Sequence, residues 1–273
     1  MNKKKIKVGA CIMVHNMAPF ISACINSLQW TDGIYLYDDH STDKSSEIAI
    51  SASTIPLIVE KSKEKKVAFK SGELKTRNYI LKRAFKVLQV DIMIIADADE
   101  LFSQELRKEI EKSFSKNNID SMAFSIWHLY TNTTYLHIWE DTINDVKMID
   151  PHTRVIKKDK KYKPLFKDGS HPILKAGENT ACLHGPYHFH LKYYHKSTLP
   201  NYSLFFLPKN IRKKDVNCYL KKLPFSLPID IKKAIKKIRW SKMPKYKETP
   251  HYTSRRKKFT KPQDALLHPR YYK

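Results

Sequence analysis

Two aspartates separated by one residue follow a short, strongly apolar segment of the chain. Asp97 and Asp99 stand in IIADADE, at the end of the strand-like segment 91–96. A continuous apolar run is typical of a strand buried on both faces, so the chain emerges at the sheet edge where the aspartates begin. Carboxylate oxygens suit Mg²⁺ or Mn²⁺, which usually keep waters and ligand phosphates in their shell. The alternative is an acidic turn that caps a helix beginning near Ser103.

The elements that must position this pair alternate between strand and helix. Apolar periodicity predicts strands at 6–14, 34–37, 56–59 and 91–96, and helices at 19–30, 41–50 (capped by Ser41 or Thr42) and 73–88. This order predicts an α/β fold: a Rossmann-like, mostly parallel central sheet with helices on both faces. Residues 121–195 consist of shorter β-like pieces rich in aromatic residues and histidine. We expect them to form a small mixed β extension of the sheet.

Polar residues follow three of the predicted strands. Open parallel sheets bind ligands beyond the carboxyl ends of their strands, so residues at these ends should converge. A nucleotide and a cation need polar groups of this kind, and we expect them to share one groove. The three sets are His15-Asn16, Asp38-Asp39 and Asp97-Ala98-Asp99.

Arg77 adds an independent observation. It lies three residues after Leu74 and four before Leu81, on the apolar side of its predicted helix. A buried guanidinium needs an anionic partner. A diphosphate is one candidate partner, and a carboxylate at the sheet edge is the other.

Four segments occur in an order that is more specific than any one of them. They are CIMVHNMAPFISACINSL, IYLYDDHSTDKS, LKTRNYILKRA and DIMIIADADELFSQEL. With them the chain resembles glycosyltransferase family 2 and its GT-A relatives over about residues 6–195. The resemblance implies a metal-dependent enzyme that moves a sugar from a nucleotide-sugar, with UDP favoured, to a glycan or lipid-linked acceptor.

The same resemblance implies roles for individual residues. Asp39, with Asp38 as its neighbour, accepts from the nucleotide base, and Arg77 contacts the diphosphate. Asp97 and Asp99 hold Mn²⁺ or Mg²⁺. The turns that surround the nucleotide also contain Val14, His15, Asn16 and Ala98.

A histidine-rich segment, LHGPYHFHLKYYH, follows much later in the chain. In a strand His188 and His190 share one face, because side chains alternate. GT-A enzymes often complete the metal shell with a distant histidine, and we assign this role to His190 first and His188 second. The segment also holds His184 and His195, and because it contains no cysteine itself we do not expect a structural zinc site.

The catalytic base is the least determined part of the site. An inverting transferase needs a carboxylate to deprotonate the acceptor hydroxyl. The segments after residue 138 are similar to the lipopolysaccharide-core branch of the family, which Arg154 and His171 fit, whereas Pro172 replaces that branch's Glu. Besides Asp99 and His171, the candidate catalytic residues are Asp141 and Asp168, with Glu140 and Asp145 as further carboxylates.

Charge divides the chain in two. Residues 201–273 hold 21 Lys and Arg against 4 Asp and Glu, so most of the net charge of +24 lies there. We expect a glycosyltransferase domain at 1–200, with a nucleotide-sugar half at 1–116 and an acceptor half at 117–200. The basic helical tail at 201–273 contains an amphipathic helix at 229–240, which fits either a membrane-surface or oligomer contact or a helix packed on the domain.

Cysteine usage and hydropathy suggest a compartment. Cys11 and Cys24 lie in apolar contexts, as expected of core thiols in a reducing environment, and the sequence has no apolar run of 18 residues. We therefore expect a cytoplasmic protein, peripheral on the inner face of a membrane.

Two other functions compete. A nucleotidyltransferase on a similar sheet would normally show a Gly-rich phosphate loop near the first strand, and none is present. A basic nucleic-acid- or membrane-binding protein without catalysis would account for the net charge. Nucleic acid is not an expected partner, because the predicted strand ends carry acidic residues that repel phosphate.

Overall fold

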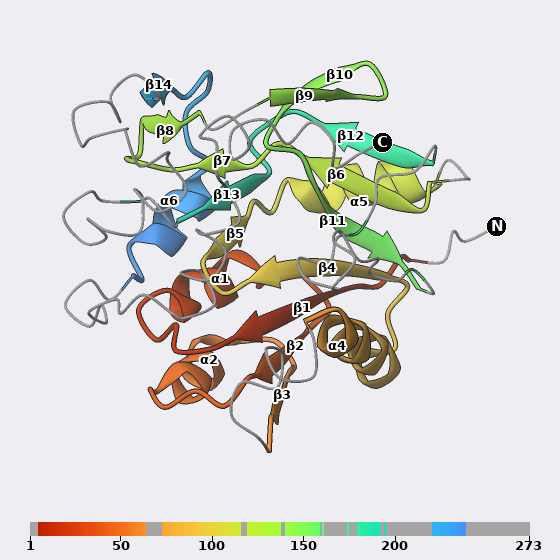
Figure 1. Ribbon diagram of the computed structural model, residues 1–273, viewed down its shortest axis with the longest axis vertical. Coiled ribbons are helices and arrows are strands. Elements are labelled where there is room, and N and C mark those ends of the chain that lie inside the picture. The colour runs from red at the N-terminus through yellow and green to blue at the C-terminus, as the bar shows by residue number, and fades with distance from the viewer. Residues whose placement is uncertain are drawn as a thin grey trace, which may run out of the picture.

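The computed structural model describes residues 5–63, 73–115, 119–137, 140–158, 160, 174, 179–191, 194 and 220–238. Its first half alternates strands and helices, as the sequence predicts (Figure 1). The elements are β1 (Val8–Val14), α1 (Ile21–Ser27), β2 (Gly33–Asp38), α2 (Ser45–Ala52), β3 (Leu57–Lys61), α4 (Glu73–Leu88) and β4 (Ile92–Asp97).

The predicted cap of the second helix is wrong. Helix α2 begins at Ser45, after Lys44, and has no side-chain cap. Ser41 instead belongs to the loop that follows β2: its N–H donates to Asp38 Oδ1 over 2.6 Å, and its Oγ accepts the Asn16 N–H over 3.1 Å. These two bonds hold residue 41 away from the helix axis.

The central sheet has seven strands in the order β12-β6-β11-β4-β1-β2-β3. Strand β1 runs parallel to both β2 and β4, and β2 runs parallel to β3. The later strands are β6 (Ser121–Phe124), β11 (His152–Lys157) and β12 (Thr180–Leu183), of which β11 is antiparallel to both of its neighbours. The predicted mostly parallel sheet with a mixed extension is confirmed.

Smaller sheets lie beside the central one. Strand β13 pairs with β5 and β7, β9 forms a hairpin with β10, and β14 pairs with β8. The remaining elements are β5 (Glu100–Phe102), α5 (Leu106–Ser115), β7 (Trp127–His128), β8 (Thr134–Leu136), β9 (Glu140–Ile143), β10 (Val146–Ile149), β13 (His188–His190), β14 (Leu220–Lys222) and α6 (Ile229–Ile235).

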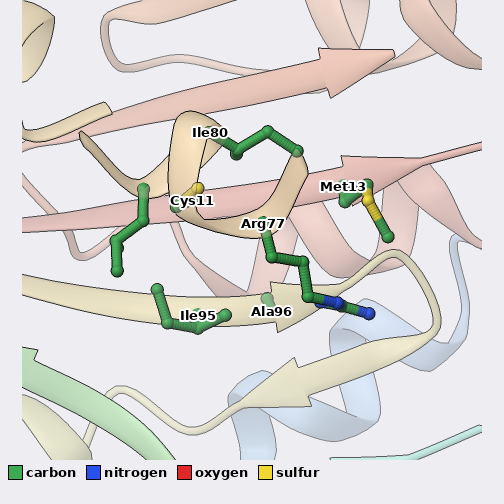
Figure 2. Close-up of a pocket in the computed structure, with 7 residues that line it drawn as sticks. Cys11, Met13, Arg77, Ile80, Ile95 and Ala96 are labelled. Atoms are coloured by element: carbon green, nitrogen blue, oxygen red, sulfur yellow. The ribbon is translucent and has the colours of Figure 1, made fainter. Parts of the chain in front are cut away.

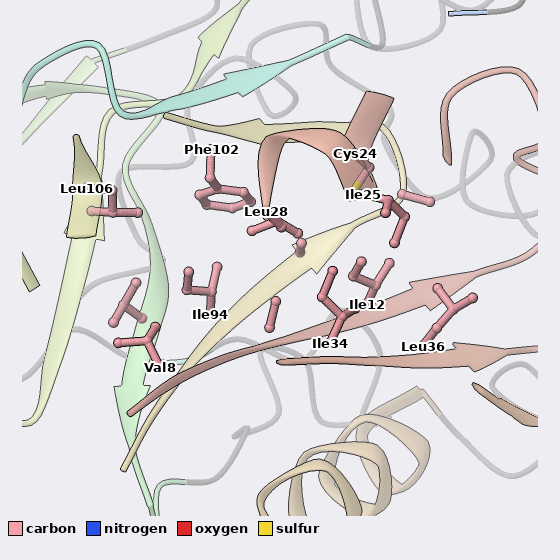
Figure 3. Packing of buried hydrophobic residues seen from close by; sticks show 14 of the residues in the cluster. Val8, Ile12, Cys24, Ile25, Leu28, Ile34, Leu36, Ile94, Phe102 and Leu106 are labelled. Atoms are coloured by element: carbon pink, nitrogen blue, oxygen red, sulfur yellow. The ribbon is translucent and has the colours of Figure 1, made fainter. Parts of the chain in front are cut away.

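Helices cover both faces of the central sheet, as predicted. On one face, alternate residues of β1, β2 and β4 pack against Cys24, Ile25 and Leu28 of α1, and against α2 and α5 (Figure 3). On the other face, Tyr35 and Met93 pack against the buried side of α4. Because successive strand residues point to opposite faces, two apolar layers require the continuous apolar strands seen in the sequence. Both Cys11 and Cys24 are buried free thiols, as expected.

Helix α6, within the predicted basic tail, packs on the domain. Ile231, Ala234 and Ile235 are almost fully buried with Phe20, Trp127 and their neighbours, whereas Ile229 is 71% exposed. Of the two alternatives that the sequence left open, the helix therefore takes the one packed on the domain. The amphipathic pattern is the same in both cases, because a protein core and a lipid boundary select the same residues. No helix among the described residues is long and apolar enough to cross a membrane. The buried set is Ile231, Ala234, Ile235 and Ile238.

Candidate active site

The three sets of polar residues meet at one edge of the sheet. Val14 of β1 lies in register with Asp38 of β2, and Met13 lies in register with Asp97 of β4. Because these strands are parallel, their carboxyl ends coincide, which is the place where such sheets bind ligands. The predicted convergence is therefore present in the backbone.

The loops after β1 and β2 are tied together. The His15 Nδ1–H donates to the Asp39 carbonyl over 2.7 Å, and the Asn16 side-chain oxygen accepts the Thr42 N–H over 2.8 Å. Asn16 has a φ of 53°, in the left-handed region that Asn tolerates better than most residues. His15 and Asn16 thus shape the turn at which the resemblance places a nucleotide.

The two neighbouring aspartates after β2 have different environments. Asp38 accepts from Ser41 N–H and Ser46 Oγ–H, so both of its oxygens serve the loop. Burial opposes ionisation of Asp38, but these hydrogen bonds lower the pKa of its carboxyl below the usual value. Asp39 is buried, and its N–H donates to the carbonyl of Val14 over 2.8 Å. Asp38 thus serves the loop and helix α2, and Asp39 is anchored through its backbone to the end of β1.

Asp97 lies between two arginines. Arg77 of α4 approaches its Oδ1 to 3.4 Å, and Arg154 of β11 approaches its Oδ2 to 3.3 Å. Of the two partners that the sequence suggests for Arg77, a diphosphate or a carboxylate, the structure shows the carboxylate of Asp97. Both distances exceed the 2.7–2.9 Å typical of strong charge-assisted hydrogen bonds. These two pairs can therefore be exchanged for other partners at modest cost.

Glu100 is a residue of the candidate site that the sequence analysis did not identify. It is 1% exposed, accepts the Asp97 N–H over 3.0 Å, and pairs with Arg154 over 2.5 Å. Burial opposes its ionisation, but the charges of Arg154 and His188 lower the pKa of its carboxyl well below the usual range. Glu100 and Arg154 therefore fix the backbone of the acidic turn. The only sequence signal was a third acid in IIADADE.

His190 reaches Asp99 from a strand 91 positions later in the chain. Its Nε2 lies 3.2 Å from Asp99 Oδ2, and the Leu191 N–H donates to the Asp99 carbonyl over 2.9 Å. His188, the second choice, lies elsewhere: its ring stacks on Phe102 and its Nε2 lies 3.3 Å from Glu100 Oε1. The geometry thus brings Asp99 together with the histidine that was ranked first.

The donor set at Asp99 suits a hard or borderline divalent cation. A carboxylate oxygen and an imidazole nitrogen are ligands that Mn²⁺ accepts, with waters and phosphate oxygens filling the other positions. Among the described residues no three His, Cys, Asp or Glu side chains form a ready-made metal cluster. The protein ligands of such a site would be Asp99 and His190. Asp97 could join them if one of its two arginine contacts were broken.

A small pocket lies between α4 and the sheet (Figure 2). Arg77 lines it and extends along β4 towards the end of that strand, past Ala96. Neither Asp39 nor Asp99 lines this pocket, so it is not the common groove that the sequence predicts. The remaining lining is apolar: Cys11, Met13, Ile80, Leu81, Ile95 and Ala96.

The candidate catalytic bases lie apart from this cluster or outside the described residues. Asp141 belongs to the β9–β10 hairpin at the far edge of the molecule in Figure 1, and its Oδ1 accepts the N–H of Thr142. Glu140 pairs with Lys147 on the same hairpin over 2.8 Å. Asp168, His171 and His195 lie outside the described residues.

No protein-family model and no curated protein matches the sequence. Among solved structures, the chain is similar to S. aureus TarS 1-349 in complex with UDP-GlcNAc, with 16% identity and a TM-score of 0.46. The match covers 67% of this chain and 58% of that one. It is also similar to Mycobacterium tuberculosis glucosyl-3-phosphoglycerate synthase in complex with Mn²⁺, UDP and glucosyl-3-phosphoglycerate, with 14% identity and a TM-score of 0.34. That match covers 45% of this chain and 44% of the other.

Proposed function

We propose that the chain is a GT-A glycosyltransferase that moves a sugar from a UDP-sugar to a glycan or lipid-linked acceptor with the help of Mn²⁺ or Mg²⁺. One observation carries the proposal: Asp99, at the carboxyl end of β4, meets His190 of β13, beside Asp97 and Arg77. Carboxylates, an imidazole and a guanidinium at one sheet edge are the groups that a cation and a diphosphate require.

Each described residue has a distinct task in this proposal. Asp39 accepts from the base, and Asp99 with His190 holds the cation. Arg77 exchanges its long contact with Asp97 for the diphosphate, which supplies a stronger charge-assisted partner. When bound, the cation neutralises charge on the diphosphate leaving group. Arg154 keeps Glu100 as its short partner, so the acidic turn retains its shape during this exchange.

A thermal-shift screen of UDP-, GDP- and CMP-sugars, each with and without Mn²⁺, tests the proposal. A ligand at about 100 times its Kd adds roughly 2.7 kcal/mol of stability. For a chain of this size that corresponds to a rise in Tm of roughly 5–10 °C. We expect this rise with a UDP-sugar and Mn²⁺ together, and a much smaller one with either alone. A nucleoside triphosphate that outperforms every nucleotide-sugar would instead favour the nucleotidyltransferase.

We further propose that the protein is cytoplasmic and binds anionic membrane surfaces through the lysines of α6. Ile231 and Ile235 are buried in the domain, so the proposed binding is mainly electrostatic. The exposed lysines are Lys232 and Lys233 of α6, with Lys236 and Lys237 directly after it. A basic residue near an anionic surface contributes about 1 kcal/mol.

The double variant Lys232→Gln/Lys236→Gln is expected to bind phosphatidylserine vesicles roughly 30-fold more weakly than wild type, since two lysines contribute about 2 kcal/mol. Co-sedimentation at low salt measures this. Lys82→Gln/Lys86→Gln on α4 is the control, because it removes two exposed lysines at the same spacing. An equal loss of vesicle affinity in both variants would mean that the net charge of the protein, and not the position of these lysines, determines binding.

A further inference from the structure

A chain of hydrogen bonds runs behind His190, away from Asp99. His190 Nδ1 lies 3.0 Å from His128 Nδ1, and His128 Nε2 lies 2.6 Å from Asp150 Oδ2. His128 is 4% exposed and Asp150 is 8% exposed. The sequence places these residues on separate segments, and the sequence analysis singled out neither His128 nor Asp150. The fold thus links two carboxylates, Asp150 and Asp99, through two imidazole rings.

The direction of each bond follows from what its atoms can do. An ionised carboxylate only accepts, so His128 Nε2 carries a proton and donates to Asp150. Burial opposes ionisation of Asp150, but the charge of His152 and the hydrogen bonds from His128 and His152 lower the pKa of its carboxyl well below the usual range. In neutral His128 the Nδ1 atom is then an acceptor. With His128 neutral and its proton on Nε2, His190 Nδ1 is the donor across the 3.0 Å contact.

We propose that Asp150 and His128 are positioning residues that keep a proton on His190 Nδ1, so that His190 Nε2 is the atom available to a divalent cation beside Asp99. The inference rests on the proposed function, because it concerns the cation of that same site. A ligating histidine commonly donates its other ring N–H to a carboxylate, a carbonyl or water. Here a second histidine stands between the ligand and its carboxylate.

The variant Asp150→Asn tests the direction of this hydrogen-bond chain, because it changes the shape of the side chain very little. Asp150 has a φ of 40°, a backbone conformation that Asn also tolerates. Where the Asn amide nitrogen takes the place of Oδ2, it donates to His128 Nε2, which reverses both bonds and leaves His190 with its proton on Nε2, facing Asp99. His152→Gln is the matched control: His152 also contacts Asp150, over 3.3 Å, but stands outside the chain.

Long-range ¹H–¹⁵N spectra of metal-free, ¹⁵N-histidine-labelled protein report which ring nitrogens of His190 carry protons, with the resonances assigned through His190→Gln. We expect a proton on Nδ1 in wild type and His152→Gln, and its loss from Nδ1 in Asp150→Asn. Electron paramagnetic resonance of free Mn²⁺ then measures affinity. Loss of an outer partner typically weakens metal binding 10- to 100-fold, and we expect this for Asp150→Asn alone.

The outcomes separate this inference from the proposed function. A wild-type His190 protonated only on Nε2 overturns the inference without the use of any variant. So does an Asp150→Asn protein that binds Mn²⁺ as tightly as wild type. A wild-type protein that binds no Mn²⁺ with or without UDP overturns the proposed cation site itself, and the role inferred for Asp150 and His128 falls with it.

Discussion

The variant Asp99→Asn is expected to transfer sugar about a thousandfold more slowly than wild type. Asp99 is the carboxylate that meets His190, and the amide removes the negative charge that the proposed cation requires there. A cation that stabilises developing charge is worth several kcal/mol, and each 1.36 kcal/mol corresponds to a factor of ten in rate. The measurement is kcat with saturating UDP-sugar and Mn²⁺, alongside the Mn²⁺-dependent rise in Tm, which the variant should lose.

A matched control for this variant is Asp145→Asn. The sequence left Asp145 open as a catalytic carboxylate, but the structure exposes it in the β9–β10 turn, apart from the strand ends. Asp145 has a φ of 62°, which Asn also tolerates. The substitution Asp145→Asn removes one negative charge, as Asp99→Asn does, but leaves the residues at the strand ends unchanged. We expect wild-type kcat and an unchanged metal response. If Asp99→Asn responded to Mn²⁺ as wild type does, the assignment of the cation to Asp99 and His190 would be wrong.

The parts of the site that the sequence predicted are those that depend on local pattern. Continuous apolar strands require a sheet covered on both faces, and a parallel sheet places its carboxyl ends together. This reasoning located Asp39, Asp97 and Asp99 from strand boundaries alone. Arg77 was identified as a buried cation because its neighbours on the helix are apolar. His190 was chosen from the resemblance, and the geometry places its ring against Asp99.

The parts that the sequence did not reveal depend on contacts between distant segments. Glu100 looks like a third surface acid until Arg154, 54 positions later, is placed on β11 beside β4. His128 and Asp150 are inconspicuous in the sequence, and only the pairing of β13 with β7 brings His128 to His190. Periodicity carries no information on such pairings.

The same limit explains why the sequence left two alternatives open for α6. The spacing of isoleucine and lysine in this helix predicts only that one face is buried. What covers that face is decided by Phe20, Trp127 and other residues more than a hundred positions earlier.

The largest effect on stability is expected from Arg154→Met. Arg154 is 12% exposed and pairs with Glu100, whose side chain is 1% exposed. Methionine fills part of the space but leaves a buried carboxylate without its main cation, and removing one partner of a buried pair typically costs about 3–5 kcal/mol. His188, 3.3 Å from Glu100, remains as a partial partner, so we expect a loss of about 3 kcal/mol at pH 7. Urea unfolding monitored by circular dichroism measures it.

The pH dependence of this loss distinguishes a buried charge from a packing defect. In wild type the pKa of Glu100 is lower in the folded than in the unfolded protein, where it is about 4.5. The ionised carboxylate therefore stabilises the fold above about pH 4.5, and this stabilisation is lost as the pH falls through the folded pKa. In Arg154→Met, burial without the cation raises the pKa of Glu100 instead. Protonation then relieves the penalty, so the difference between variant and wild type should shrink from pH 7 towards pH 5.

The matched control is Arg83→Met. Arg83 also pairs with a glutamate, Glu60, over 3.2 Å, but both side chains are substantially exposed. Exposed pairs contribute about 0–1 kcal/mol, because water already solvates both charges. We expect a small, pH-independent loss for Arg83→Met. Similar losses in the two variants, or a loss in Arg154→Met that is constant with pH, would show that Glu100 does not depend on Arg154 for its charge. The acidic turn that carries Asp97 and Asp99 would then be held by its backbone alone.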